Sequence, residues 1–548
     1  MLIRKARKWL KKLSASQRYI FLASFIAFFF SFAGVLFFTF LSTGSYVPEK
    51  GGSYVEGVIG SPRFINPILA PANEVDRALV KLIFPSLVTY TSKGDIVPYA
   101  AKDINVLENG KVYEFILRNG MVWEDGKPFS AQDVVFTVST IQNEKIASPL
   151  NRIWSGVKAE AIGSLKVRFS LPHPYAFFLQ NATLGILPSH IWGSIPPSEF
   201  ANSEYNAKPI GAGPYRLQRL SRINGAIVSA ILKENPTYFG QKPFIPEILF
   251  EFYPDSKQLV DAYEKEQVQS IPVPSISLYT ELAAQKNTKV YTFMLPRYFA
   301  LFLNEKANPV LGRKEVRQAL AYAIQKKKII SDILGSQAQG VTTPIVPALK
   351  NYYKEAPDPY EYNPQKAKEL LKKAGFEKKP LAIELTLIDN DSLTEVAQKV
   401  IRDWQAIGVN TTIKHVGLDK LREEILQKRE YQVFLFGQSL ALEPDPFSLW
   451  HSSQQQSLGL NLSSYKNPKM DKLLEDLRQT TDVSKQKEFF VQFQSIMTQD
   501  VPAIFLYSPY QLFMTRDNIK GIIPGVLSLP EDRFNQVADW YINTKRIK

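Results

Sequence analysis

An uninterrupted apolar segment near the N-terminus constrains this chain more than any other feature of its sequence. Residues 19–41 contain no charged side chain and consist mainly of Phe, Leu, Ile and Ala. At about 1.5 Å per helical residue, such a run is long enough to cross the roughly 30 Å hydrocarbon core of a bilayer. The sequence therefore predicts one transmembrane helix over residues 19–41.

The charges in front of this segment predict its orientation. Residues 1–18 contain seven Lys and Arg residues and no acidic residue. Because basic residues accumulate on the cytoplasmic side, we expect a cytoplasmic tail over residues 1–18, a stalk over residues 42–53 and a body outside the cytoplasm. A cleaved signal peptide is the alternative, although its apolar region is usually only about 7–15 residues long. Both interpretations place the body in the periplasm or at the cell surface.

The composition of the body excludes several classes of protein. The chain is 45% hydrophobic and 12% aromatic, which is too apolar for a disordered protein. It contains no cysteine, and its four histidines lack metal-ligand spacing, so we expect no metal and no cofactor. Half of the net charge of +14 lies in residues 1–18, and so dilute a remainder argues against nucleic-acid binding.

Helix-like and strand-like patterns alternate along the rest of the chain, which predicts an α/β body. Turn and capping residues bound several of these elements. The predicted elements are a strand over 111–118 before Asn119-Gly120, a helix opened by the capping box Ser130–Asp133, a helix over 315–334, a helix between Asn363 and Gly375, strands over 383–388 and 433–436, and a helix starting at Asn467.

Three segments come close to known catalytic or nucleotide-binding motifs, but each lacks a residue that its motif requires. The glycine-rich segment 335–340 lacks the lysine of a phosphate-binding loop, and Arg216 stands where the segment after Gly211 needs a third glycine for a dinucleotide fingerprint. Segment 437–441 resembles a nucleophile elbow but ends in Ala441 instead of glycine. We therefore expect a protein that is not an enzyme.

Three aromatic and proline-rich segments lack catalytic groups: 64–67, 298–304 and 439–451. Loops of this kind, with a carboxylate nearby, suit a pocket for an apolar or peptide-like ligand that carries an amine.

These segments and others resemble, in the same order, the dipeptide- and oligopeptide-binding proteins of ABC importers, which form extracytoplasmic solute-binding protein family 5. The matching segments are 73–90, 123–137, 209–215, 303–304, 315–324, 362–376, 443–446 and 467–471. The most specific of them are Trp-Glu-Asp-Gly, which is followed by Ala-Gln-Asp-Val, and the Val-Arg-Gln-Ala helix.

The resemblance implies a two-lobed fold of the periplasmic-binding-protein type II kind, with an extra subdomain, preceded here by the transmembrane helix. Lobe one would comprise residues 54–90, 205–297 and 508–548, the extra subdomain 91–204 and lobe two 298–507. Two crossing strands, near residues 297–304 and near Tyr507, would form the hinge on which the lobes close.

The resemblance also implies the candidate ligand-binding residues. In peptide-binding relatives an aspartate pairs with the ligand's α-amino group, and its position falls on Leu442 here. The adjacent Glu443 is an acid that can replace it, and Asp445 matches the family's acid before proline. The strand that would pair with a peptide backbone is Ser439, Leu440 and Ala441. The remaining candidates are Phe64, Asn66, Tyr298 and Trp450, of which Trp450 is equally well explained as a core residue.

From these residues and the resemblance we expect a monomeric, membrane-tethered binding protein that captures peptides and delivers them to the permease of an ABC importer. Two alternatives stay open. The same fold also binds non-peptide solutes such as nickel chelates or sugars, which suits a loop with few acids. A hydrolase or a sensor on this fold is the other alternative.

Overall fold

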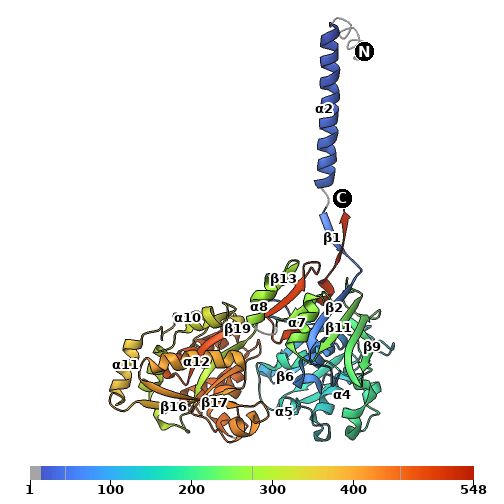
Figure 1. Cartoon of the computed structure of the whole chain (residues 1–548). Coiled ribbons are helices and arrows are strands. Elements are labelled where there is room, and N and C mark those ends of the chain that lie inside the picture. Colours follow the sequence, from blue (N-terminus) through green and yellow to red (C-terminus); the bar gives the residue numbers. More distant parts are fainter. Residues whose placement is uncertain (1–13, 43–44, 274–275, 457, 548) are drawn as a thin grey trace.

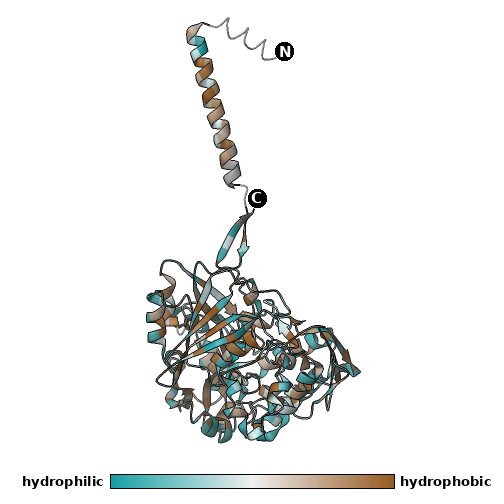
Figure 2. Ribbon diagram, turned by 90° about the vertical axis from the view of Figure 1, so that its right-hand side faces the viewer, coloured by the Kyte–Doolittle hydropathy of each residue, from teal (hydrophilic) through white to brown (hydrophobic). Residues whose placement is uncertain are grey.

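The computed structural model describes residues 14–42, 45–273, 276–456 and 458–547. Helix α2 (Ala15–Ser42) projects away from the body (Figure 1). Among the described residues it is the one helix that is long and apolar enough to cross a membrane, and none of its most apolar window is buried in the protein. In Figure 2 the ribbon of this helix is coloured largely as hydrophobic, whereas hydrophobic and hydrophilic residues are mixed throughout the body. Residues 1–13 of the predicted cytoplasmic tail lie outside the described residues.

The predicted stalk contains a strand that pairs with the other end of the chain. Strand β1 (Ser45–Glu49) runs antiparallel to β20 (Asn543–Ile547), with Val47 opposite Lys545. The C-terminal strand therefore lies beside the segment that joins α2 to the body (Figure 1). Local composition alone does not reveal this pairing, because the two partners are separated by the whole body.

A 12-stranded mixed sheet runs through two lobes. The first lobe contains β2 (Ser53–Ile59), β9 (Tyr215–Ile223), β10 (Ala226–Glu234), β11 (Glu247–Tyr253), β12 (Ser270–Pro272) and β13 (Thr288–Met294). The second lobe contains β14 (Arg297–Leu303), β15 (Ala338–Gly340), β16 (Leu381–Ile388), β17 (Val409–Val416) and β18 (Val433–Ser439). The second lobe lies on the left of Figure 1 and the first lobe on the right.

One strand belongs to both lobes. The first half of β19 (Ala503–Arg516) pairs with β14 and β15, and its second half pairs with β12 and β13. The chain crosses a second time between β13 and β14, at Leu295 and Pro296. The two crossings lie next to each other because both β13 and β14 pair with β19.

Each lobe has its own hydrophobic core. The core of the first lobe draws on residues between 54 and 295 and between 513 and 540. The core of the second lobe draws almost wholly on residues between 298 and 507, and Tyr90, Phe177 and Val526 join it from outside that range. These three side chains show that the lobes are packed against each other in this structure.

Residues between the first strands of the first lobe form the extra subdomain. It contains the short pair β3 (Val88–Tyr90) and β4 (Ile96–Pro98) at its edge and a four-stranded antiparallel sheet. The strands of that sheet are β5 (Ala101–Leu107), β6 (Val112–Leu117), β7 (Lys158–Ala161) and β8 (Lys166–Ser170). Helix α4 (Ala131–Gln142) contacts β7 and β8.

The helices fill the space around these sheets. In the first lobe they are α3 (Glu74–Ile83), α7 (Ser256–Glu264), α8 (Ile276–Ala283) and the 3₁₀ segment η12 (Pro530–Asp539), and in the extra subdomain α5 (Asn151–Trp154) and α6 (Ser189–Trp192) accompany α4. In the second lobe they are α9 (Lys314–Tyr322), α10 (Lys326–Lys328), α11 (Pro364–Lys373), α12 (Asp391–Gln405), α13 (Phe447–Trp450), α14 (Pro468–Gln479) and α15 (Val483–Asp500).

Most of the capping signals mark the helix ends observed. The Asp133 carboxylate accepts the backbone N–H of Ser130 at 2.8 Å, as the capping box predicts. Asn363 caps α11 and Asn467 caps α14 through their side-chain oxygens. The predicted helix over 315–334 is wrong in one respect, because it is interrupted after Tyr322 and resumes at Lys326.

Candidate functional site

A cavity of about 450 Å³ lies where the first lobe, the extra subdomain and the second lobe meet. Its lining includes Arg77, Val80, Lys81, Phe84, Ser86, Thr89, Tyr90, Tyr99, Trp154, Gln180, Thr183, Leu184, Ala441, Ser528, Glu531, Asp532, Phe534 and Asn535. Mostly apolar walls with a few convergent polar groups are the usual form of a ligand-binding pocket. This cavity is therefore the candidate functional site.

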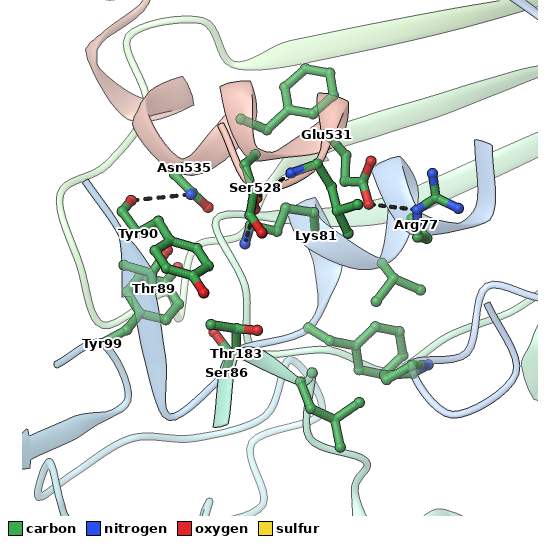
Figure 3. A pocket seen from close by; sticks show the side chains of 18 of the residues that line it. Arg77, Lys81, Ser86, Thr89, Tyr90, Tyr99, Thr183, Ser528, Glu531 and Asn535 are labelled. Atoms are coloured by element: carbon green, nitrogen blue, oxygen red, sulfur yellow. Dashed lines mark hydrogen bonds and ion pairs between the residues drawn. The ribbon is translucent and has the colours of Figure 1, made fainter. Parts of the chain in front are cut away.

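The charged side chains of the cavity are paired with one another. Arg77 and Lys81 lie four residues apart on α3, so they point from the same face of the helix. The Nε of Arg77 donates to Glu531 at 2.6 Å, and the Nζ of Lys81 lies 2.9 Å from the carboxylate of Asp532 (Figure 3). These two pairs leave the cavity wall without a net charge.

Three acceptor oxygens on the lining residues lack a donor within the described part of the protein. They belong to Gln180 (Oε1), Glu531 (Oε2) and Asn535 (Oδ1). The side-chain amide of Asn535 donates to the carbonyl oxygen of Tyr90 at 3.1 Å, which holds it across the cavity wall (Figure 3). Buried acceptors of this kind are normally satisfied, so the cavity favours a ligand that brings N–H donors.

Asp76, in the first turn of α3, fixes the position of the helix that carries Arg77 and Lys81. The carboxylate of Asp76 accepts the backbone N–H groups of Arg63 at 2.6 Å and of Phe64 at 2.9 Å. Burial raises the pKa of Asp76 to about 6 in spite of these bonds. The loop before α3 is thereby tied to the helix, and with it the half-buried predicted residue Phe64, which is not a lining residue of the cavity.

Two of the predicted site residues are buried in hydrogen-bond networks. Asn66 is completely buried, donates to Asn206 at 3.1 Å and accepts the N–H of Ile68 at 3.1 Å. Tyr298 is also completely buried, and its hydroxyl donates to Gln438 at 2.7 Å. Both arrangements hold neighbouring backbone in place.

Trp450 lies in the core of the second lobe. It has no exposed surface and packs against Phe302 and Phe505, with ring centroids 6.1 and 5.9 Å away. This placement fits the core interpretation of Trp450 that the sequence also allowed.

The end of β18 brings the predicted backbone-binding residues to the cavity. Ser439 is exposed, and its Oγ accepts a hydrogen bond from Arg297 at 3.2 Å. The N–H of Leu440 donates to the carbonyl of Pro296 at 2.8 Å, and the Leu440 side chain is buried. Ala441 lines the cavity, and within the described residues neither its N–H nor its C=O takes part in a hydrogen bond.

Leu442 and Glu443, which follow in the loop, differ sharply in their surroundings. Leu442 is only 5% exposed and belongs to the core of the second lobe. Glu443 is half-buried and forms no hydrogen bond or ion pair with any described residue. Burial raises its pKa to about 7. Its charge also contributes, after burial, to the raised pKa of Tyr113 and of Tyr352.

Asp445 is already paired inside the protein. Its carboxylate lies 2.6 Å from the Nη2 of Arg478 and accepts a hydrogen bond from the hydroxyl of Tyr175 at 3.1 Å. Tyr175 belongs to the extra subdomain, and Asp445 and Arg478 belong to the second lobe. Asp445 therefore joins two parts of the protein, whereas Glu443 is the unpaired acid of this loop.

The sequence interpretation missed the residues from α3 and η12 that form much of the cavity wall. Arg77 and Lys81 are the two basic residues of α3 and stand four residues apart, which was the available signal. Glu531 and Asp532 gave no such signal, because they reach the cavity only after the C-terminal segment returns to the first lobe. Among the described residues, no group of three or more metal-ligating side chains is placed to hold a metal ion.

Comparisons with known proteins agree with this architecture. Residues 95–458 match the family model of the bacterial extracellular solute-binding proteins, family 5. The chain is 28% identical over 492 residues to the oligopeptide-binding protein AppA of Bacillus subtilis, covering 86% of this chain and 89% of AppA. It is 27% identical over 500 residues to the dipeptide-binding protein of Escherichia coli, covering 85% of this chain and 90% of that protein. It is 29% identical over 375 residues to the nickel-binding periplasmic protein of Escherichia coli, covering 64% of this chain and 68% of that protein.

Solved structures show the same fold. The structure of AppA from Bacillus subtilis in complex with a nonapeptide has a TM-score of 0.72 and 26% identity, and the match covers 91% of this chain and 100% of that chain. The substrate-binding protein CtaP of Listeria monocytogenes has a TM-score of 0.80 and 25% identity, covering 90% of this chain and 100% of that chain. With a family model that spans most of the body, the chain belongs to the bacterial extracellular solute-binding proteins of family 5.

Proposed function

We propose that this chain is an extracytoplasmic peptide-binding protein that acts as a monomer and delivers peptides to the permease of an ABC importer. One observation carries the proposal. The cavity between the lobes is lined by Ala441, whose backbone is unbonded among the described residues, and its walls hold acceptors without donors. The unpaired Glu443 lies two residues further along the same loop. A peptide supplies the matching groups, because it carries backbone N–H and C=O groups and an α-ammonium.

In this proposal the peptide is an additional strand that pairs with the end of β18 and the residues after it. Ser439, Leu440 and Ala441 lie along its backbone, and Glu443 receives its α-amino group. Recognition of the backbone leaves the identity of the side chains free, while the cavity accepts one or more of them. Leu442 takes no part, since its side chain is buried in the second lobe.

We further propose that the lobes close on the ligand about the two crossings. Lobe one would comprise 54–90, 205–297 and 508–548, the extra subdomain 91–204 and lobe two 298–507. Among the described residues, only β19 and the connection from β13 to β14 join the strands of the two lobes, which is the arrangement that a hinge requires. Closure then presents a ligand-dependent shape to the transporter.

Helix α2 would tether this body to the cell membrane, with residues 1–18 in the cytoplasm. The exposed apolar surface of α2 supports this proposal. A tether of this kind keeps the binding protein close to its permease at a high effective concentration. Cleavage of the segment as a signal peptide would instead release the body outside the cytoplasm.

The test is to purify the full chain in detergent and to identify what is bound to it by native mass spectrometry followed by denaturing release and sequencing. A mixture of short peptides is the expected result. The proposal fails if the protein is empty and no peptide pool raises its thermal unfolding temperature.

A second candidate function is the binding of a non-peptide solute. Leu442 stands where peptide-binding relatives carry an aspartate, and one relative is a nickel-binding protein. In that case the co-purifying molecule would be a small solute, and Glu443→Gln would not change the binding of any peptide.

A further inference from the structure

The extra subdomain touches the second lobe at a contact that is separate from the two crossings. The N–H of Ala176 donates to the carbonyl oxygen of Arg478 at 2.9 Å, although the two residues lie on opposite sides of the boundary between the lobes. We call this contact the clasp. It consists of Tyr175, Ala176 and Phe177 from the extra subdomain and Asp445, Arg478 and Phe490 from the second lobe, and none of these six residues lines the cavity.

Phe177 is the apolar part of the clasp. Its side chain has no exposed surface and belongs to the core of the second lobe, where its ring centroid lies 6.5 Å from that of Phe490. The next residue, Phe178, is buried in the core of the first lobe instead, against Tyr113 and Trp154. Opening the boundary between the lobes would therefore transfer Phe177 from a packed core into water and leave Phe178 in place.

Arg478 organises the polar part of the clasp. Its guanidinium donates to the carboxylate of Asp445 at 2.6 Å and lies 3.8 Å from the ring centroid of Phe447 and 5.7 Å from that of Tyr175. The hydroxyl of Tyr175 donates to the same carboxylate at 3.1 Å. Arg478 and Asp445 both belong to the second lobe, so their ion pair would survive opening, whereas the contacts with Tyr175 would be lost.

The extra subdomain approaches the second lobe so closely here that a glycine is required. Gly110 has a φ of +84°, and a Cβ on it would lie 2.7 Å from the Cγ2 of Thr481. Its carbonyl oxygen accepts the N–H of Tyr175 at 3.0 Å, and the neighbouring Asn109 accepts the hydroxyl of Thr481 at 3.1 Å. Two segments of the extra subdomain are thus bonded to each other and contact the second lobe together.

We propose that the extra subdomain holds the two lobes closed in the absence of ligand, and that withdrawal of Phe177 from the second lobe is the step that admits and releases the ligand. This inference rests on the proposed function, because it requires lobes that open and close about the two crossings. No clasp contact involves a ligand, so each is present in the empty and in the loaded closed protein. Because the clasp stabilises both closed states alike, it sets the rates of ligand exchange and leaves the affinity unchanged.

The first measurement follows opening of the empty protein. The chain contains no cysteine, so Ile162→Cys in the extra subdomain and Leu418→Cys in the second lobe, both at exposed positions, accept a fluorophore pair on the full chain in detergent. Single-molecule energy transfer should show a dominant closed state. Phe177→Ala should lower the closed-to-open ratio by about 100-fold or more. Phe177→Asp, which places a carboxylate in the core of the closed protein, should be mainly open.

Phe178→Ala is the matched control, because it removes the same side chain from the neighbouring position and leaves the boundary between the lobes unchanged. It should lower stability in urea denaturation and keep the closed-to-open ratio of the wild type. Tyr175→Phe is a milder variant that removes only the hydroxyl on Asp445, and it should lower the ratio by about two- to tenfold, the range of one hydrogen bond. This variant decides the question if an alanine variant fails to fold.

The second measurement follows ligand exchange. A pool of Ala-Xaa-Ala tripeptides, with every residue at Xaa, is passed over the immobilised full chain, and binding is recorded by surface plasmon resonance. In Tyr175→Phe we expect association and dissociation to accelerate by the same factor of about two to ten, with an unchanged Kd.

The outcomes separate the clasp from the proposed function. An empty wild-type protein that is mainly open overturns the clasp, and so does an equal shift of the ratio in Phe177→Ala and Phe178→Ala. A changed Kd in Tyr175→Phe with unchanged rates also overturns it. Each of these results leaves peptide binding intact. A pool that does not bind at all refutes the proposed function, while the energy-transfer distributions of the empty protein still decide whether the clasp exists.

Discussion

The raised pKa of Glu443 predicts that peptide binding depends on pH. In the empty protein this carboxyl has a pKa of about 7, because it is buried and has no described partner. A bound α-ammonium stabilises the ionised form and lowers the pKa of the carboxyl by about one to three units. Below pH 7, binding must therefore release a proton from Glu443, and affinity falls as the pH falls.

The size of the effect follows from the fraction of Glu443 that is ionised. With a pKa of about 7, this fraction drops from about 0.76 at pH 7.5 to about 0.09 at pH 6.0, a factor of about eight. The peptide amine, with a pKa near 7.8, becomes about 1.5-fold more protonated over the same range. If the bound pKa is lower by one to three units, the net expectation is an affinity about three- to sixfold weaker at pH 6.0 than at pH 7.5.

Isothermal titration calorimetry in buffers of different ionisation enthalpy measures both the affinity and the proton released. Glu443→Gln should bind free-amine peptides more weakly at pH 7.5 and lose the decline toward pH 6.0. An affinity that is flat between these pH values in the wild-type protein, or an identical decline in Glu443→Gln, would refute the assignment of the amine to Glu443.

The raised pKa of Glu443 also makes the stability of the empty protein depend on pH. Because the pKa of Glu443 is higher in the folded state than in the unfolded chain, the folded state holds this proton more tightly. The stability that this provides is present below about pH 4.5 and is lost as the pH rises through about 7. The difference in unfolding midpoint between wild type and Glu443→Gln should therefore change over this range.

Three further substitutions test the fold around the site. Trp404→Ala removes a completely buried side chain from the second lobe and should lower the free energy of unfolding by about 3–5 kcal/mol, as measured by urea denaturation. Gly211→Ala places a Cβ about 2.1 Å from the carbonyl oxygen of Ile83, so we expect at least about 1–3 kcal/mol of destabilisation in the same assay, while an unchanged midpoint would show that the α3 contact is not rigid. Arg478→Met leaves the carboxylate of Asp445 without its partner, and because this pair is partly exposed we expect a loss of about 1–3 kcal/mol, with recovery in a double variant that also carries Asp445→Asn.

Signals confined to one element were readable from the sequence. The capping box at Ser130 and the caps at Asn363 and Asn467 predicted where helices begin, because a cap depends only on residues within one turn. The interruption after Tyr322 was not predictable in this way. The N–H and the side chain of Gln325 both donate to Asp403, which lies on a different helix, so a distant partner fixes the break.

The same distinction, between local signals and distant partners, applies to the candidate site. The resemblance located the loop with Ser439, Ala441 and Glu443, since those residues are contiguous. The chemical difference between Glu443 and Asp445 required the structure, because Asp445 is occupied by Arg478 from another helix. The cavity of about 250 Å³ that Arg297 helps to line was not predictable from the sequence, because its lining comes from seven separated segments.

The division of the two cores along the chain also sets the order in which they become complete during synthesis. The second core needs almost only residues 298–507, whereas the first begins near residue 54 and ends near residue 540. At about 5–20 residues per second, the stretch between residues 295 and 513 takes a ribosome roughly 10–45 s. Throughout that interval, β2 and α3 lack the second half of β19 and η12, so part of their apolar surface has no packing partner. The lobe that is encoded first is thus the lobe that folds last.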